Sequence, residues 1–232
     1  GAAAYYLAQQ GAKIVGIIDK DGGLISESGF GMEEIKNLME TRNGNALAHP
    51  DMIPFAEVNQ KIWDVKADIF IPAAASKIVQ KEQVDKMCAN GLEVISCGAN
   101  VPFADTEVFY GDIAKYTDTK CTVVPDFIAN CGMARTFGYL MGENIEITDE
   151  AIFNDASNNL LRLSRFSFSL LSGHLTTSIR PKSPLAMFSG LANESSLSGT
   201  LCPIIEKKGL GQPFSRCERT FSHWSLYASS LQ

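Results

Sequence analysis

The chain has 232 residues, of which 45% are hydrophobic and 20% charged, and its formal net charge is −6. These values are typical of a globular chain with its own core, and the negative charge disfavours a nucleic-acid partner. No apolar run reaches the length of a membrane span. The six cysteines form no CxxC pair or metal-type spacing. We therefore expect a cytoplasmic protein with reduced thiols, no membrane association and no bound metal.

Charge and serine content divide the chain into two unlike parts. Residues 1–155 carry 12 Lys and Arg against 23 Asp and Glu. Residues 156–232 carry 8 against 3, and they include 16 serines. We therefore predict a domain over residues 1–158 and an unassigned, irregular tail over residues 159–232. The tail is interpreted as disordered or as spurious sequence of the kind that a frame change produces.

The predicted elements alternate between helices and strands along the domain. Helical composition or spacing marks residues 2–10, 32–41, 81–89, 107–116 and 129–141. Short apolar runs typical of buried strands lie at residues 13–19, 67–74, 92–100 and 121–127, and residues 21–30 are expected to form a turn-rich loop. Such alternation predicts an α/β fold of the Rossmann-like, doubly wound type with a mainly parallel sheet. Ligands of these sheets bind where the strands reach their carboxyl ends.

Two positions near the start match parts of a dinucleotide fingerprint. Gly1 directly precedes a helix, as the last of the three fingerprint glycines does, so the first strand and two glycines are expected to be missing. Asp19 ends a strand 18 residues later, near the spacing of about 20 for the acid that accepts ribose hydroxyls. Its charge favours NAD, whereas Lys20 could offset repulsion of the 2′-phosphate of NADP. The alternatives are an ordinary glycine before a helix and a solvated turn aspartate.

Four stretches in the right order resemble the cofactor-binding domain of the glutamate/leucine/phenylalanine/valine dehydrogenases. They are GAKIVGIIDKDGGL (11–24), ADIFIPAAA (67–75), CGANVP (97–102) and VVPDFIANCGM (123–133). The insert between residues 21 and 57 is more similar to the glutamate branch. The resemblance covers about two-thirds of the chain, from residue 1 to about residue 155.

The resemblance implies roles for several residues, each with a plainer alternative. Ala73 and Ala74 would let the dinucleotide lie against the backbone, or they serve helix–sheet packing. Gly98 and Asn100 would lie beside the nicotinamide ribose, or they form an ordinary turn. Asn130 would lie near the nicotinamide, or it is the N-cap of a helix starting there, and both roles are compatible.

The substrate side departs from the family pattern. Relatives usually have Gly-Gly-Val where this chain has Cys131-Gly132-Met133, and a serine that often contacts the substrate carboxylate is absent. Thr136 could replace that serine. The family's catalytic lysines and aspartate belong to a preceding domain, so no catalytic residue is assigned.

The resemblance implies the cofactor-binding half of an NAD(P)-dependent amino-acid dehydrogenase that deaminates an L-amino acid, with glutamate as the expected substrate. The fragment alone is expected to be inactive, and the full enzyme is expected to be a homo-oligomer that takes a small-molecule amino acid. The alternative is a non-catalytic dinucleotide-binding or oligomer-interaction module.

Overall fold

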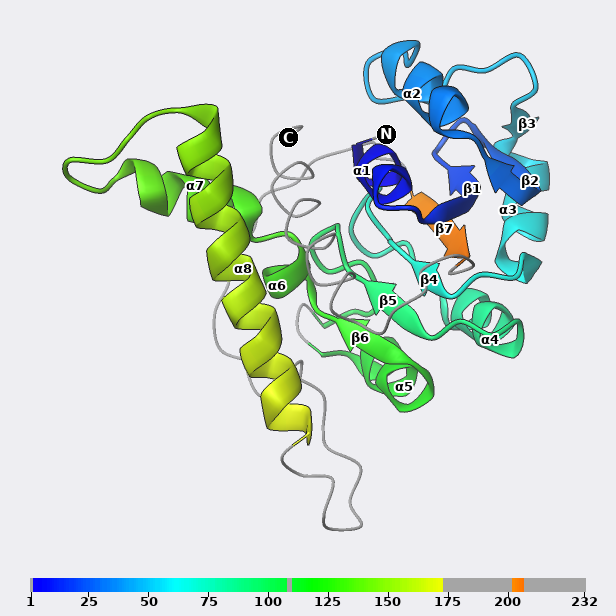
Figure 1. Ribbon diagram of the computed structural model, residues 1–232. Coiled ribbons are helices and arrows are strands. Elements are labelled where there is room, and N and C mark those ends of the chain that lie inside the picture. The colour runs from blue at the N-terminus through cyan, green and yellow to red at the C-terminus, as the bar shows by residue number, and fades with distance from the viewer. Residues whose placement is uncertain (1, 108–109, 173–201, 207–232) are drawn as a thin grey trace.

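The computed structural model describes residues 2–107, 110–172 and 202–206, which form a mixed α/β fold (Figure 1). Its described strands make one seven-stranded sheet in the order β3-β2-β1-β7-β4-β5-β6. The strands are β1 (Lys13–Ile18), β2 (Gly22–Phe30), β3 (Ile53–Pro54), β4 (Ile69–Phe70), β5 (Val94–Ser96), β6 (Thr122–Val124) and β7 (Cys202–Glu206). The helices are α1 (Ala2–Gln9), α2 (Met32–Glu40), α3 (Phe55–Lys61), the 3₁₀ helix η1 (Ile62–Asp64), α4 (Lys81–Ala89), α5 (Asp112–Lys120), α6 (Asp126–Ala129), α7 (Gly132–Leu140) and α8 (Asp149–Ser172).

One flank of the sheet is parallel, as the alternating pattern predicts. β4 pairs with β5, and β5 with β6, in parallel register. α4 spans the predicted residues 81–89. α5, in contrast, begins at Asp112 rather than at residue 107. Its start is fixed by the buried Asp105 carboxylate, which accepts hydrogen bonds from the backbone N–H groups of Ile113 (2.7 Å) and Ala114 (3.0 Å).

The other flank is antiparallel, so the expectation of a loop over residues 21–30 is wrong. β2 occupies most of this stretch and pairs antiparallel with β1, and β3 continues the ladder beyond it. Glycine at position 23 makes the close pairing possible, since a Cβ there would lie 2.6 Å from the backbone oxygen of Ile17. The stretch reads as a loop because its second half is polar and half-exposed, which gives no continuous apolar run.

β7 joins the two flanks, and it comes from the tail. Its backbone pairs antiparallel with β1 on one side and with β4 on the other. α8 also runs without a break through residue 158 to Ser172. The expectation of an irregular tail is therefore wrong for residues 159–172 and 202–206, while 173–201 and 207–232 lie outside the described residues. The first strand ahead of α1, the boundary at residue 158 and the disordered or spurious nature of the tail stay predictions.

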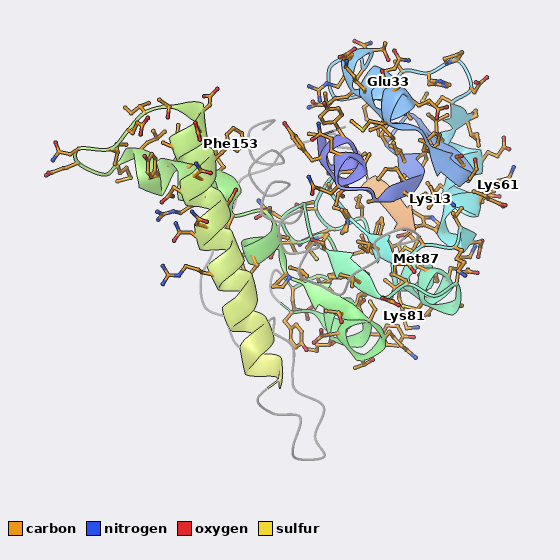
Figure 2. The ribbon with its side chains drawn as sticks, in the orientation of Figure 1. Lys13, Glu33, Lys61, Lys81, Met87 and Phe153 are labelled. Atoms are coloured by element: carbon orange, nitrogen blue, oxygen red, sulfur yellow. The ribbon has the colours of Figure 1, made fainter. Side chains whose placement is uncertain are left out.

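Helices cover both faces of the sheet, as a doubly wound fold requires. One core contains side chains of α3, η1, α4 and α5 packed on Val15, Phe70 and Ile95. The other contains side chains of α1 and α2 packed on Ile14 and Ile69. Figure 2 labels one of these core side chains, Met87 on α4. Adjacent residues of β4 thus enter opposite cores, as the two-residue period of a strand dictates.

Candidate functional site

The carboxyl ends of four strands lie at one edge of the sheet. β1 and β4 are both antiparallel to β7, so they point in the same direction, and β5 and β6 are parallel to β4. In a sheet of this kind that edge is where ligands bind. It carries Asp19 and Lys20 after β1, and it carries the turns that follow β4, β5 and β6.

Small residues follow β4 and β5 side by side. Ala73 and Gly98 are buried and Ala74 is partly buried. The N–H of Ala99 donates to the backbone oxygen of Pro72 at 2.8 Å, which ties the two turns together. The structure therefore brings these three predicted residues to adjoining turns, where no long side chain of their own covers the backbone.

Asn100 and Asn130 meet at the ends of β5 and β6. The Asn130 side-chain amide donates a hydrogen bond to the Oδ1 atom of Asn100. Asn100 is exposed, and its Nδ2 group, a donor of two hydrogen bonds, is not used in the bond with Asn130. Asn130 is the residue that ends α6. Cys131, not Asn130, is the N-cap of α7, so the alternative of Asn130 as a helix N-cap is wrong.

Asp19 is buried and holds the turn between β1 and β2. Its Oδ1 accepts the N–H groups of Asp21 (2.8 Å) and Gly22 (3.0 Å), and its Oδ2 accepts that of Leu47. The alternative of a solvated turn aspartate is therefore wrong for Asp19, although the residue does organise the turn. A ribose hydroxyl would have to share a carboxylate that already has three backbone donors.

Lys20 is exposed beside that turn and is paired with Asp21. The Nζ atom lies 2.7 Å from Asp21 Oδ2, and 71% of the side chain is accessible. The hydrogen bond and the charge of Asp21 raise the pKa of Lys20 above its ordinary value. Lys20 thus carries a full positive charge, but the neighbouring carboxylate partly cancels it.

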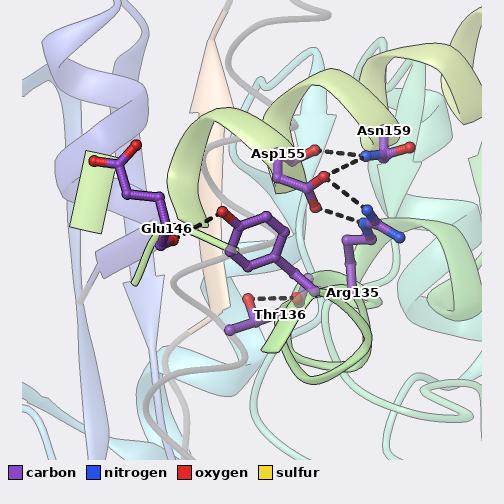
Figure 3. A network of polar contacts seen from close by, with 7 residues as sticks. Arg135, Thr136, Glu146, Asp155 and Asn159 are labelled. Carbon is purple, nitrogen blue, oxygen red and sulfur yellow. Dashed lines mark hydrogen bonds and ion pairs between the residues drawn. The ribbon is translucent and has the colours of Figure 1, made fainter. Parts of the chain in front are cut away.

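Thr136 lies on α7, in an arm formed by α7 and α8 (Figure 1). Its hydroxyl donates to the backbone oxygen of Gly132 at 3.0 Å. Beside it, Arg135 forms a bidentate pair with Asp155 of α8, at 2.6 and 2.7 Å (Figure 3). This pair fixes α7 against α8 and so orients the face that carries Thr136.

Two thiols near the strand ends are held in their neutral form. Burial raises the pKa of Cys97 well above its ordinary value, and the nearby charge of Asp126 acts in the same direction. Burial also raises the pKa of Cys131. Because the thiolate is the nucleophile, neither residue is suited to covalent chemistry.

Asp126 lies in one of the strand-end loops where a ligand is expected from the sequence, but the sequence alone assigns it no role. It follows β6 at the start of α6 and accepts the N–H of Val101, 25 residues earlier in the chain, at 2.7 Å. A Pro-Asp pair directly after a strand was the available signal. Gly1 lies outside the described residues, so its predicted place near the pyrophosphate stays a prediction.

The described residues contain neither a helix that could span a membrane nor a cluster of metal-ligating side chains. None of the described helices is long and apolar enough to cross a bilayer. Nor do three or more His, Cys, Asp or Glu side chains gather there in a way that could hold a metal ion.

The parallel strands, the helices on both faces and the polar edge define a Rossmann-like α/β fragment. Residues 1–154 match the model of the glutamate/leucine/phenylalanine/valine dehydrogenase family, and the chain belongs to that family.

Several curated relatives are glutamate dehydrogenases. The chain is 29% identical over 145 residues to the NAD(P)-specific glutamate dehydrogenase of Xylanibacter ruminicola, covering 60% of this chain and 31% of the relative. It is 31% identical over 130 residues to the NADP-specific enzyme of Saccharolobus shibatae, covering 56% and 28%. It is 26% identical over 140 residues to the NADP-specific enzyme of Escherichia coli, covering 58% and 30%. The matched part thus spans about a third of the length of these relatives.

Proposed function

We propose that this chain is the cofactor-binding part of an NAD(P)-dependent amino-acid dehydrogenase that acts on glutamate. The observation that carries the proposal is the meeting of Ala73, Gly98, Asn100 and Asn130 at the carboxyl ends of β4, β5 and β6. These residues come from three separate family motifs. The family and the names of the relatives supply the reaction class, oxidation of an amino acid with a nicotinamide dinucleotide.

The residues at the edge fit the nicotinamide half of the cofactor. Ala73 and Gly98 carry no side chain larger than a methyl group, so a ribose or a ring could approach the backbone of the turns after β4 and β5 closely once the groups that bury them move aside. Asn130 donates to Oδ1 of the exposed Asn100, and the Nδ2 group of Asn100 is the part of that side chain that would donate to the cofactor. A bound nicotinamide would accept the hydride from substrate, while these residues bind and orient it.

The adenosine half would lie at the end of β1. Asp19 is proposed to accept a ribose hydroxyl, and Lys20 to attract the 2′-phosphate of NADP. The burial of Asp19 and the pairing of Lys20 with Asp21 weaken both contacts, so neither cofactor is strongly selected by this turn. We therefore propose that the chain accepts NAD or NADP.

The amino acid would lie near α7, with the hydroxyl of Thr136 turned toward its carboxylate. That contact requires the hydroxyl to leave Gly132, to which it donates here. No acid–base residue is assigned within the chain, so we propose that proton transfer needs residues of a longer protein. The chain alone should then bind cofactor without oxidising glutamate.

Binding of NADH and NADPH tests the proposal directly. Titrating the full chain with each, and following nicotinamide fluorescence, should give a saturable increase. Asn100→Ala should weaken binding about tenfold, the equivalent of one hydrogen bond. Asn90→Ala is the matched control, because Asn90 donates to Lys86 at the end of α4, ahead of β5 at the opposite edge. No saturable signal at millimolar cofactor, or equal effects of the two substitutions, would contradict the proposal.

A further inference from the structure

The turn after β5 has an unusual backbone at the residue beside Asn100. Val101 has a φ of +46°, a left-handed conformation that β-branched residues rarely adopt. Such a residue persists only where its surroundings hold it. In this structure both the backbone N–H and the backbone oxygen of Val101 form hydrogen bonds.

Asp126 and Lys77 clamp the peptide groups of Val101. The Val101 N–H donates to Asp126 Oδ2 at 2.7 Å, and its backbone oxygen accepts the N–H of Lys77 at 2.8 Å. The other carboxylate oxygen of Asp126 accepts the N–H of Phe127 at 2.8 Å. Each oxygen of Asp126 therefore has one backbone donor, and the carboxylate links the start of α6 to the turn after β5.

This link fixes the spacing between the two asparagines. Val101 directly follows Asn100, and Asn130 ends the short helix α6 that Asp126 begins. With both ends anchored to the same carboxylate, the Asn130 amide can reach Asn100 Oδ1. Without Asp126, the left-handed Val101 would relax and carry Asn100 away from Asn130.

We propose that Asp126 is a positioning residue that sets the orientation of the Asn100 amide for cofactor binding by clamping Val101 in its left-handed conformation. The proposal rests on the proposed function for its ligand, but the clamp itself is a property of the chain alone. Asp126 acts through Asn100 and need not touch the cofactor.

Asp126→Asn is the direct test, because an amide accepts only through one of its two ends. One of the two backbone donors, Val101 or Phe127, then faces an NH₂ group. We expect the side-chain amide resonance of Asn130 in the NMR spectrum to move toward that of a solvent-exposed asparagine. We also expect affinity for NADH to fall about tenfold.

Asp105→Asn is the matched control. Asp105 lies in the same turn, and each of its carboxylate oxygens also accepts a backbone N–H, but from α5. Its substitution should lower the denaturation midpoint while leaving the Asn130 resonance in place and the NADH affinity within about twofold. A merely structural role for Asp126 predicts that the two variants behave alike.

The two readouts separate this proposal from the proposed function. An unmoved Asn130 resonance in Asp126→Asn, or an equal movement in Asp105→Asn, overturns the clamp whether or not NADH binds. A moved resonance with unchanged NADH affinity overturns the link to the cofactor. A wild-type chain that fails to bind NADH contradicts the proposed function and the cofactor part of this proposal, while the resonance still decides the clamp.

A second substitution covers the case in which Asp126→Asn does not fold. Should Asp126→Asn not fold, Val101→Gly is added, because glycine adopts a φ of +46° without strain. The anchor to α6 is still lost in this double variant, so weakened NADH binding is expected. Wild-type affinity in the double variant would overturn the proposal.

Discussion

The two flanks of the sheet differ in how the chain connects one strand to the next. Between β1 and β2 the return is a tight turn, Asp19–Gly22, closed by a hydrogen bond of 2.8 Å from the N–H of Asp19 to the oxygen of Gly22. Between β4, β5 and β6 the strands are parallel, so each return needs a helix on the face of the sheet. The candidate cofactor residues divide in the same way between the tight turn and the ends of the parallel strands.

This difference decides which polar groups remain open to a ligand. The carboxylate of Asp19 already accepts two N–H groups of the tight turn and that of Leu47, and Lys20 is paired with Asp21. The parallel flank leaves the side chain of Asn100 exposed, with Asn130 bound at its Oδ1 atom. For the proposed cofactor, the parallel flank therefore has the more accessible polar groups, and the hairpin flank would have to rearrange to bind adenosine.

The largest effect should come from separating the flanks. Ending the chain after Ser172 removes β7, whose backbone pairs with both β1 and β4. The ladder groups of both strands would lose their partners, so the free energy of unfolding should fall by about 4 kcal/mol or more. Urea unfolding of the shortened and full chains measures this.

A chain ending after Glu206 is the control for that truncation, since it keeps β7 and loses only residues 207–232. It should unfold near the full-length midpoint. If the chain ending at Ser172 also unfolds at that midpoint with the same slope, β7 does not join the flanks.

A smaller effect should follow from crowding the hairpin flank alone. In Gly23→Ala the new Cβ would meet the backbone oxygen of Ile17 at 2.6 Å and the Cα of Ile18 at 3.2 Å. Backbone must shift, which should cost about 1–3 kcal/mol of stability by urea unfolding. Gly138→Ala on α7 is the control, because its Cβ meets nothing within 4 Å, and it should stabilise by about 0.5–1 kcal/mol. A neutral Gly23→Ala would show that the two strands can separate freely.

On the parallel flank, the buried thiol of Cys97 should make the free energy of unfolding depend on pH. Burial raises the pKa of Cys97 in the folded protein, so the folded state keeps this proton while the unfolded thiol loses it above about pH 9. The stability linked to Cys97 is complete below that pH and declines as pH rises, by about 1.4 kcal/mol per pH unit.

Comparison with Cys97→Ala isolates this contribution. The difference in unfolding free energy between wild type and variant should be constant below about pH 8 and should shrink from about pH 9 upward. A difference that stays constant to about pH 10 would mean that water reaches Cys97 at the end of β5.

Prediction from sequence succeeded on the parallel flank, where helical spacing and short apolar runs are visible locally. α4 was placed to the residue, and the strands at 92–100 and 121–127 contain β5 and β6. It failed at β2, whose glycines and serines look like a loop but permit close pairing with β1. It also failed at β7, which pairs across a large separation in sequence that no local pattern reveals.

The sequence by itself determined the family, the alternation of elements and the small or amide-bearing residues at the strand ends, because these depend on local composition and spacing. Only the tertiary structure decided which of those residues act together. The bond from Asn130 to Asn100 spans 30 residues, the bond from Asp126 to Val101 spans 25, and the bond from Leu47 to Asp19 spans 28. The first two contacts form because parallel strands bring their ends to one edge, and the third because the segment before β3 folds back to the end of β1. No spacing along the chain specifies these pairs.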